Sequence, residues 1–222
     1  MDNRNEGLQA RASKPYLTYL VVIYSTCLLM ANILANTMIA LGPFTVSAGS
    51  LTFPFTFVIA SVIGEIYGYK WARRAAWTAV SMNVLMSLLI ILAINLPAPE
   101  WHDRTHFELA LQNTWRIVLG SITAFTAGKW INDNIHAFLK KRHTEKGGKP
   151  LQNFIFRALG SSLVGQTIDS AIFFGIAFAG IIDIPTLGGM ILVTTLLQLG
   201  YEVAVSPATV KITRWIYNKE NS

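Results

Sequence analysis

The sequence predicts an all-α integral membrane protein, and three observations support this prediction. Hydrophobic residues make up 52% of the 222 residues. Charged residues make up only 14%, against about 25% in soluble domains. The hydrophobic residues are gathered in long segments, and most of the charged residues lie between them. This composition excludes most soluble enzymes, disordered proteins and nucleic-acid-binding proteins, which need a charged, water-facing surface.

Six segments contain the roughly 20 predominantly apolar residues that a helix needs to cross a bilayer. They cover residues 16–41, 51–68, 75–96, 115–135, 156–182 and 187–212. The first is predicted to be a retained helix and not a signal peptide, because no small-residue cleavage site flanks it. The prediction is therefore one transmembrane domain at residues 16–217, between a tail of residues 1–15 and a tail of residues 218–222.

The connections between these segments are short. Residues 42–50 are rich in Gly, Pro and Ser, which predicts a short extended hairpin. Residues 97–114 carry two prolines and mixed charge, which predicts a surface loop with an interfacial helix. The single cysteine, Cys27, lies inside the first apolar segment, so a disulfide framework and a Cys-based zinc site are excluded.

The basic residues predict the orientation in the membrane. Thirteen Lys and Arg lie in residues 1–15, 69–74, 136–155 and 213–222, whereas the alternate connections hold only Arg104. Cytoplasmic connections carry the excess of Lys and Arg. We therefore expect six crossings with both termini in the cytoplasm. The same residues account for the net charge of +6 without a nucleic-acid partner.

The fifth segment carries a polar stripe. Ser162, Gln166, Asp169, Ser170 and Phe173 recur at helical spacing and share one face. Lipid cannot satisfy such a face, so it must line a cavity or contact other helices. A carboxylate at mid-membrane costs roughly 2.5–3.5 kcal/mol on insertion scales, and Asp169 has no basic residue three or four positions away. We expect Asp169 either to pair with a cation on another helix or to bind a ligand.

Polar residues of the first two segments have a structural interpretation beside the functional one. Asn32 and Asn36 share a helix face with Ser25. They serve either as ligand contacts or as interhelical hydrogen bonds, which are worth about 0.6 kcal/mol on average. Glu65 lies close to the basic residues 70–74, so it is either a site residue or an anchor for the inner end of its helix.

The remaining charged residues of the segments have the same two interpretations. Glu202 lies inside the sixth segment and Lys211 nearer its cytoplasmic end. Arg157 and Lys211 are within reach of the cytoplasmic interface, where long basic side chains place their charge in water. The fourth segment carries Lys129.

No enzyme, cofactor or metal site is predicted. The chain lacks the Gly-x-x-x-x-Gly-Lys-Ser/Thr loop of ATP hydrolases. Its four histidines lie in connections or at segment ends, and Ser170 next to Asp169 is not a nucleophile–base arrangement. An intramembrane enzyme is therefore the minority alternative.

Five sets of residues follow one another along these segments. They are residues 31–36; residues 53–56 with 65–70; residues 124–132; Arg157 with residues 160–170 and Phe173; and residues 201–203 with Pro207 and Lys211. In this order they resemble the queuosine-precursor transporter family, also called the vitamin uptake transporter family, from about residue 16 to residue 217. Similar members often have Asp where Ser61 stands and Glu or Gln where Lys129 stands.

The resemblance implies a bacterial inner-membrane importer of deazaguanine bases, the cyano and aminomethyl precursors of the tRNA nucleoside queuosine. It also implies six helices arranged like the substrate-binding subunits of energy-coupling-factor vitamin transporters. The expected partners are the small-molecule base and the lipid bilayer, with no nucleic acid. Three forms of energy coupling stay open: facilitated diffusion by the chain alone, a proton or sodium gradient used through Glu65 or Asp169, or docking on a separate energy-coupling ATPase module. A homo-oligomer is a further candidate partner.

A guanine-like base presents adjacent N–H donors, which a carboxylate can accept as a bidentate pair, and a carbonyl to which an amide or a basic side chain can donate. Asp169 is the first choice for the donor edge, followed by Glu65 and Glu202. The other predicted substrate-binding residues are Gln166, Asn32, Asn36, Arg157 and Lys211, with Phe53, Phe57, Tyr67 and Phe173 as stacking or packing aromatics.

Two alternatives to this importer stay open from the sequence. One is an uptake subunit for a vitamin or another heterocycle that works with a separate ATPase module. The other is a non-transporting membrane scaffold, in which the polar stripe only holds helices together.

Overall fold

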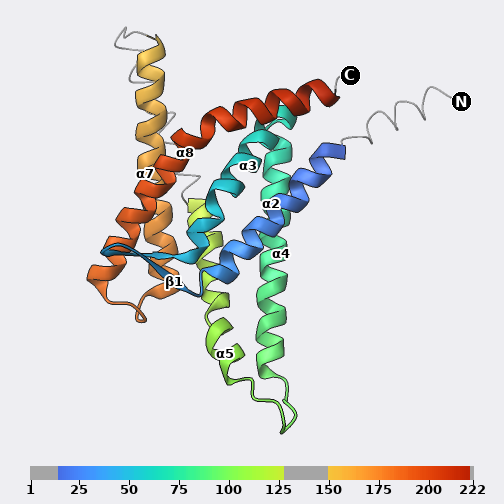
Figure 1. Cartoon of the computed structure of the whole chain (residues 1–222), viewed down its shortest axis with the longest axis vertical. Coiled ribbons are helices and arrows are strands. Elements are labelled where there is room, and N and C mark those ends of the chain that lie inside the picture. The colour runs from blue at the N-terminus through green and yellow to red at the C-terminus, as the bar shows by residue number, and fades with distance from the viewer. Residues whose placement is uncertain (1–14, 128–149, 221–222) are drawn as a thin grey trace, which may run out of the picture.

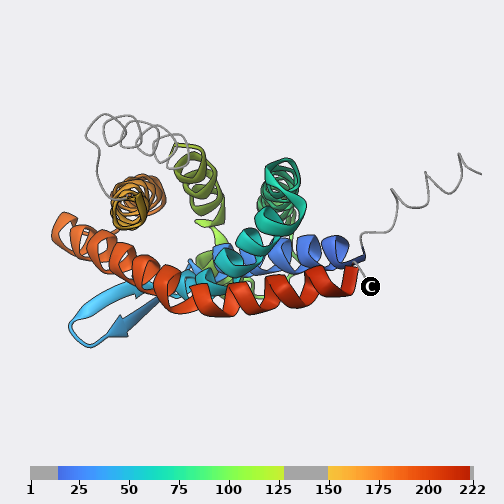
Figure 2. The same cartoon turned by 90° about the horizontal axis from the view of Figure 1, so that it is seen from above.

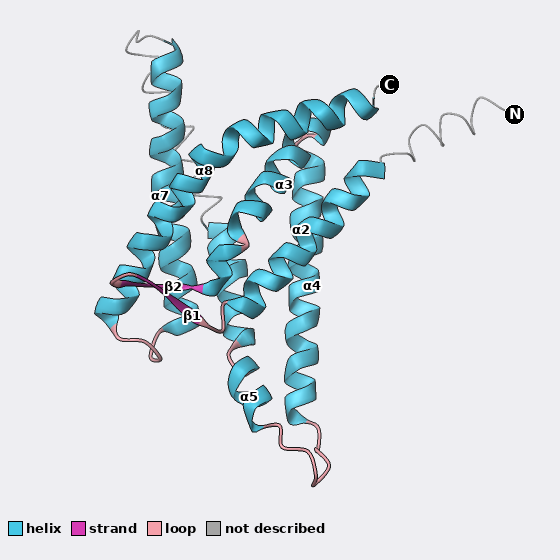
Figure 3. Cartoon of the chain, in the orientation of Figure 1, coloured by secondary structure: helices cyan, strands magenta, loops and turns pink. Residues whose placement is uncertain are grey.

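The computed structural model is a bundle of long helices with one small hairpin at its side (Figure 1, Figure 3). It describes residues 15–127 and 150–220, and the side chains of residues 16–52, 54–127 and 163–219. The helices are α2 (Pro15–Leu34), α3 (Phe53–Tyr67), α4 (Tyr69–Asn95), α5 (Thr105–Leu111), residues 114–127, α7 (Pro150–Phe178) and α8 (Ile184–Glu220). Strand β1 (Met38–Leu41) pairs antiparallel with β2 (Phe44–Ser47), from Met38↔Ser47 to Leu41↔Phe44, and the 3-10 helix η1 (Ala48–Leu51) follows.

Three helices of the described chain are long and apolar enough to cross a membrane. They are Tyr16–Leu34, Tyr69–Asn95 and Ile184–Lys219. Two shorter apolar stretches, Pro54–Tyr67 and Leu163–Phe178, accompany them. Residues 128–135 of the predicted fourth segment lie outside the described residues. The structure therefore agrees with a helical membrane protein, whereas the count of six crossings and the orientation stay predictions.

The first predicted segment is too long at its C-terminal end, because residues 38–41 form a strand and not a helix. The Asn36 amide donates to the backbone carbonyls of Asn32 and Ile33 at 3.3 and 3.1 Å. These carbonyls are thereby satisfied without a further helical turn. Gly42, at φ +62°, then supplies the left-handed residue of the hairpin turn. The hairpin was expected, but it begins earlier than residue 42.

The connection predicted at residues 69–74 is helical. Gly68, at φ +81°, joins α3 to α4 through a backbone conformation that residues with a Cβ rarely adopt. Lys70, Arg73 and Arg74 therefore lie exposed on the first turns of α4. The Arg74 guanidinium is 4.8 Å from the centre of the Trp71 ring, so part of this basic group stacks on its own helix.

Helix α8 is longer than the segment predicted at 187–212, and it begins at Ile184 and ends at Glu220. It contains Pro207, and Figure 1 shows the helix changing direction along its course. An internal proline bends a helix because it removes one backbone donor and its ring crowds the preceding turn. The 97–114 connection contains the short helix α5, as predicted, and its interfacial position stays a prediction.

Two apolar clusters hold the bundle together. One joins α2, α3 and α4 through Leu17, Tyr24, Ile63, Ala75 and Ala79. The other joins the residue that follows α2, Ala35, to the helix of residues 114–127, α7 and α8, through Ile117, Phe174, Ala177, Phe178 and Met190. Seen from above, α2 and α8 lie along one side of the molecule, whereas α4, the 114–127 helix and α7 lie toward the other (Figure 2).

The beginning of α2 and the end of α8 lie at the same end of the bundle (Figure 1). The rings of Tyr16 and Trp215 meet there edge to face, with their centres 5.9 Å apart. The α3–α4 junction is at this end too, and the loop before α5 is at the opposite end. The fold thus gathers the basic first turns of α4 and the end of α8 on one side.

Candidate functional site

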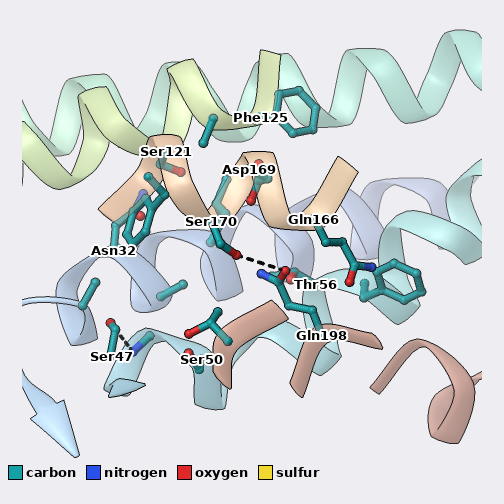
Figure 4. Close-up of a pocket in the computed structure, with 18 of the residues that line it drawn as sticks. Asn32, Ser47, Ser50, Thr56, Ser121, Phe125, Gln166, Asp169, Ser170 and Gln198 are labelled. Carbon is teal, nitrogen blue, oxygen red and sulfur yellow. Dashed lines mark hydrogen bonds between the residues drawn. The ribbon is translucent and has the colours of Figure 1, made fainter. Parts of the chain in front are cut away.

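A cavity of about 520 Å³ lies between the helices (Figure 4). Every helix of the described chain except α5 contributes to its wall, together with β2 and η1. The polar side chains that line it are Asn32, Ser47, Ser50, Thr56, Ser121, Gln166, Asp169, Ser170, Thr194, Gln198 and Glu202. Its volume lies within the roughly 300–1,000 Å³ of small-molecule sites.

The α7 wall is built from the stripe predicted in the fifth segment. Gln166, Asp169, Ser170 and Phe173 all line the cavity, because they share one face of α7. The side chain of Ser162 lies outside the described side chains. A polar helix face therefore lines a cavity here, which was one of the two outcomes expected for it.

The Asp169 carboxylate stands apart from the other polar groups of the α7 wall. It points into the cavity (Figure 4), and no hydrogen bond or ion pair from a described residue reaches it. The cation on another helix, which was one of the two expectations, is thus not found in the described part of the chain. Its two oxygens are available to accept hydrogen bonds from a bound molecule.

Helix α8 faces this stripe with a second one that the sequence analysis missed. Thr194, Gln198 and Glu202 recur every four residues and so share one face, although only Glu202 was singled out. The Gln166 amide donates to the Glu202 carboxylate at 2.9 Å, and the Ser170 hydroxyl donates to the Gln198 carbonyl oxygen at 3.5 Å. The i, i+4 spacing was the signal in the sequence that pointed to Gln198.

On the opposite wall, Asn32 of α2 is paired with a residue that the sequence analysis did not select. The Asn32 amide donates to the Asn83 carbonyl oxygen of α4 at 2.5 Å, and the Asn83 amide donates to the backbone carbonyl of Ala79 at 2.9 Å. Asn32 and Asn83 are 4% and 2% exposed. Asn32 therefore forms the interhelical hydrogen bond of its structural interpretation, and it also lines the cavity.

The η1 helix closes the cavity next to α2, and a glycine allows this close approach. A Cβ placed on Gly49 would lie 2.6 Å from the backbone oxygen of Ala31. The Ser47 hydroxyl accepts from the Gly49 backbone N–H at 3.2 Å and so fixes the start of η1. Any larger residue at position 49 would push η1 away from α2.

Comparison with known proteins identifies the family. The model of the family described as "Putative vitamin uptake transporter" matches residues 47–212. The chain belongs to the vitamin uptake transporter family. This membership supports a membrane transport role and not an enzymatic one. No solved structure matches the chain.

Two curated bacterial proteins are similar to this member of the vitamin uptake transporter family. A "Probable queuosine precursor transporter" of Bacillus subtilis (strain 168) is 25% identical over 195 residues, which cover 86% of this chain and 82% of the relative. A protein of the same name from Haemophilus influenzae is 25% identical over 131 residues, which cover 59% of this chain and 51% of the relative.

Several residues selected in the sequence of this family member lie away from the cavity. The Asn36 amide donates to the Thr114 hydroxyl at 3.1 Å and so links the end of α2 to the helix of residues 114–127. Glu65 and Lys211 are exposed on α3 and α8, and Tyr67 packs against the α2–α3–α4 cluster. None of the four lines the cavity.

Other selected residues contribute to the cavity or lie outside the described side chains. Phe57 and Phe173 line the wall, together with Phe125, which the sequence analysis did not select. The side chains of Phe53 and Arg157 lie outside the described side chains, and Lys129 lies outside the described residues.

The described wall of the cavity is acidic. It contains two carboxylates, Asp169 and Glu202, and among its described residues there is no Lys, Arg or His. Arg116, the basic residue of the neighbouring 114–127 helix, instead donates to the backbone carbonyls of Ile176 and Ala179 at 3.2 and 2.8 Å. No group of three or more potential metal ligands occurs in the described residues.

Proposed function

We propose that this protein imports deazaguanine bases, the cyano and aminomethyl precursors of queuosine, across the bacterial inner membrane. The observation that carries the proposal is the Asp169 carboxylate, which faces a cavity of about 520 Å³ without a partner among the described residues. The names of the two relatives support the substrate class. The expected topology for this role is six crossings with both termini in the cytoplasm.

The cavity offers complementary groups for each edge of such a base. Asp169 would accept from the ring N–H and the exocyclic amino group as a bidentate pair. Gln198 lies across the cavity on α8, and its NH2 group has no acceptor among the described residues, so it can donate to the ring carbonyl. Phe57, Phe125 and Phe173 offer aromatic faces or edges to the ring.

Release would follow from rocking of the helices around this site. Binding sites of many transporters lie between packed helices, and access alternates as one group of helices moves against the other. Here α7 and α8 carry Asp169, Gln166, Gln198 and Glu202, whereas α2 and η1 carry the opposite wall. A relative movement of these two groups would open the cavity and separate the contacts of the base.

The direct test is uptake in bacteria that can neither make nor import the precursors. Cells that express the protein are fed each base, and queuosine is measured in their tRNA. We expect queuosine to return with the wild-type protein and with Glu100→Gln, a charge-removing change in an exposed loop residue. Asp169→Asn should lower uptake about ten- to hundredfold, because hydrogen bonds to a charged group are worth roughly 1.5–3 kcal/mol.

Two outcomes would overturn the proposal. Wild-type protein that is inserted and folded but restores no queuosine would reject the substrate class. In that case a vitamin panel in the same cells would test the alternative uptake role. Normal uptake by Asp169→Asn at equal protein level would reject Asp169 as the main contact.

A further inference from the structure

Hydrogen-bond partners fix the orientation of two amides in the cavity wall. Asn83 donates to the backbone carbonyl of Ala79, so its own carbonyl oxygen faces Asn32 and must accept from the Asn32 NH2 group. An ionised carboxylate only accepts, so Gln166 must likewise turn its NH2 group toward Glu202. Each of the two amides therefore donates one hydrogen bond to another group of the protein.

The carbonyl oxygens of these two amides accept no hydrogen bond from a described residue. Asn32 lines the cavity, is 4% exposed and receives no hydrogen bond at its Oδ1 from any described residue. The Oε1 of Gln166 likewise has no donor among the described residues, but this oxygen is itself buried against the protein. The Asn32 oxygen is therefore the amide acceptor that a molecule with N–H groups would satisfy.

The charges of the wall point in the same direction. Asp169 and Glu202 line one cavity, and no described lining residue carries a positive charge. Asp169 has no hydrogen-bond or ion-pair partner among the described residues, and a carboxylate inside a membrane protein is costly unless a cation or a donor compensates it. Because the cavity is surrounded by low-dielectric material, both carboxylates attract a cation over several ångströms, whether or not they contact it.

We propose that the cavity selects the cationic aminomethyl base over the neutral cyano base, because its described lining carries two carboxylates and no positive charge. This inference rests on the proposed function and specifies its substrate. Asn83 is then a positioning residue, since it holds Asn32 with its carbonyl oxygen toward the ligand.

The aminomethyl and cyano substituents differ in charge and in their hydrogen-bonding groups. A primary amine on a methylene carbon is protonated at neutral pH and brings three N–H donors, as a lysine ammonium does. A nitrile is neutral and can only accept, so it would gain nothing from the Asn32 oxygen or from the negative charge of Asp169 and Glu202. The ring is common to both bases, and its single carbonyl can accept from Gln198.

The test measures affinities of three bases for the full-length protein in detergent or nanodiscs by isothermal titration calorimetry. The bases carry an aminomethyl, a hydroxymethyl or a cyano group. The hydroxymethyl base matches the size of the aminomethyl base but has no charge. We expect the aminomethyl base to bind about tenfold or more tightly than either neutral base, as expected for an ammonium near carboxylates at low dielectric.

Two isosteric substitutions then remove one charge each. Asp169→Asn and Glu202→Gln should each lower the aminomethyl-to-hydroxymethyl affinity ratio by about threefold or more, because both charges act on the ammonium. Glu100→Gln, outside the cavity, should leave the ratio unchanged. Each variant is used only if its size-exclusion profile and thermal unfolding match those of the folded wild type, and either cavity variant alone suffices for the test.

The outcomes separate this inference from the proposed function. A ratio near one in the wild type, or a ratio unchanged in the folded cavity variants, would overturn the inference. The importer role would then still stand, because the bases bind. Binding of no deazaguanine by folded protein would overturn both. A wild-type preference that falls in the cavity variants and persists in Glu100→Gln would support both.

Discussion

The two walls of the cavity use their polar groups differently. On the α2–α4 wall, Asn32 and Asn83 each donate one hydrogen bond within the protein, and the two residues are 4% and 2% exposed. On the α7–α8 wall, Gln166 and Glu202 form a hydrogen bond with each other. Asp169, on the same face of α7 as Gln166, has no partner among the described residues. The first wall is therefore held rigid by internal hydrogen bonds and offers a ligand only the Asn32 oxygen, whereas the second wall offers a whole carboxylate.

This difference predicts that changes on the two walls separate function from stability. The largest functional effect is expected for Asp169→Asn. Uptake should fall about ten- to hundredfold, whereas the thermal unfolding midpoint should stay the same or rise, because the change removes an uncompensated charge and breaks no hydrogen bond of the described protein. Parallel uptake and unfolding measurements check this. A large drop in the midpoint would instead assign Asp169 a structural partner.

The opposite pattern is expected on the α2–α4 wall. Asn83→Ala removes the acceptor of the Asn32 NH2 group and leaves that amide buried without its partner. Because an orphaned buried polar group costs about 1–3 kcal/mol, the protein should lose about that much stability, measured by thermal or denaturant unfolding in detergent.

Ser81→Ala is the matched control on the same helix. Its hydroxyl donates only to the Trp77 backbone carbonyl, and the residue is exposed, so little change in stability is expected. Equal unfolding midpoints for Asn83→Ala and the wild type would contradict the rigid-wall interpretation. The two walls would then not differ in the way described.

A third change tests how closely η1 must approach the α2 wall. Gly49→Ala would place a Cβ 2.6 Å from the Ala31 backbone oxygen, so the backbone must shift. Such overpacking typically costs about 1–3 kcal/mol. Gly175→Ala is the control: its Cβ meets nothing within 4 Å, and within α7 the change should stabilise slightly, by about 0.5–1 kcal/mol. Equal effects of the two substitutions on the unfolding midpoint would show that the approach is not tight.

The sequence predicted the helical membrane class and the α7 wall, because helical spacing and hydropathy are local properties. It did not predict Asn83 or Gln198, whose importance depends on which helices pack together. Asn83 could have been noticed, since it shares a buried face of α4 with Ala76, Ala79 and Ser87. A single asparagine on a face of small residues, however, gives no indication of its partner on α2.

Segment ends were predicted less well, for a related reason. The apolar residues 38–41 continue the hydrophobic run of α2, so hydropathy alone extends the helix. The side chain of Asn36, which satisfies two helical carbonyls, decides against it. Likewise, Gly68 reverses the chain without a loop, which hydropathy does not register. In both places a local hydrogen bond or backbone conformation overrides the hydropathy pattern.

The smallest expected effect contrasts Asp169 with a second aspartate at the start of α8. Asp183 is exposed, and its carboxylate accepts from the Thr186 backbone N–H at 3.0 Å. Hydrogen bonds from the backbone N–H and the side chain of Thr186 lower the pKa of Asp183 below its ordinary value. A lowered native pKa stabilises the fold above the unfolded-state value of about 3.9, and the contribution is lost as the pH falls through the native value.

Asp183→Asn should therefore make the unfolding midpoint slightly less dependent on pH below about 4, without altering uptake at neutral pH. The reason is that the asparagine can still accept from the Thr186 N–H but no longer titrates. Unfolding of both proteins across this acid range checks the prediction, with the wild-type slope as reference. An effect on uptake as large as that of Asp169→Asn would contradict it, because it would place a helix cap outside the cavity among the groups that contact the substrate.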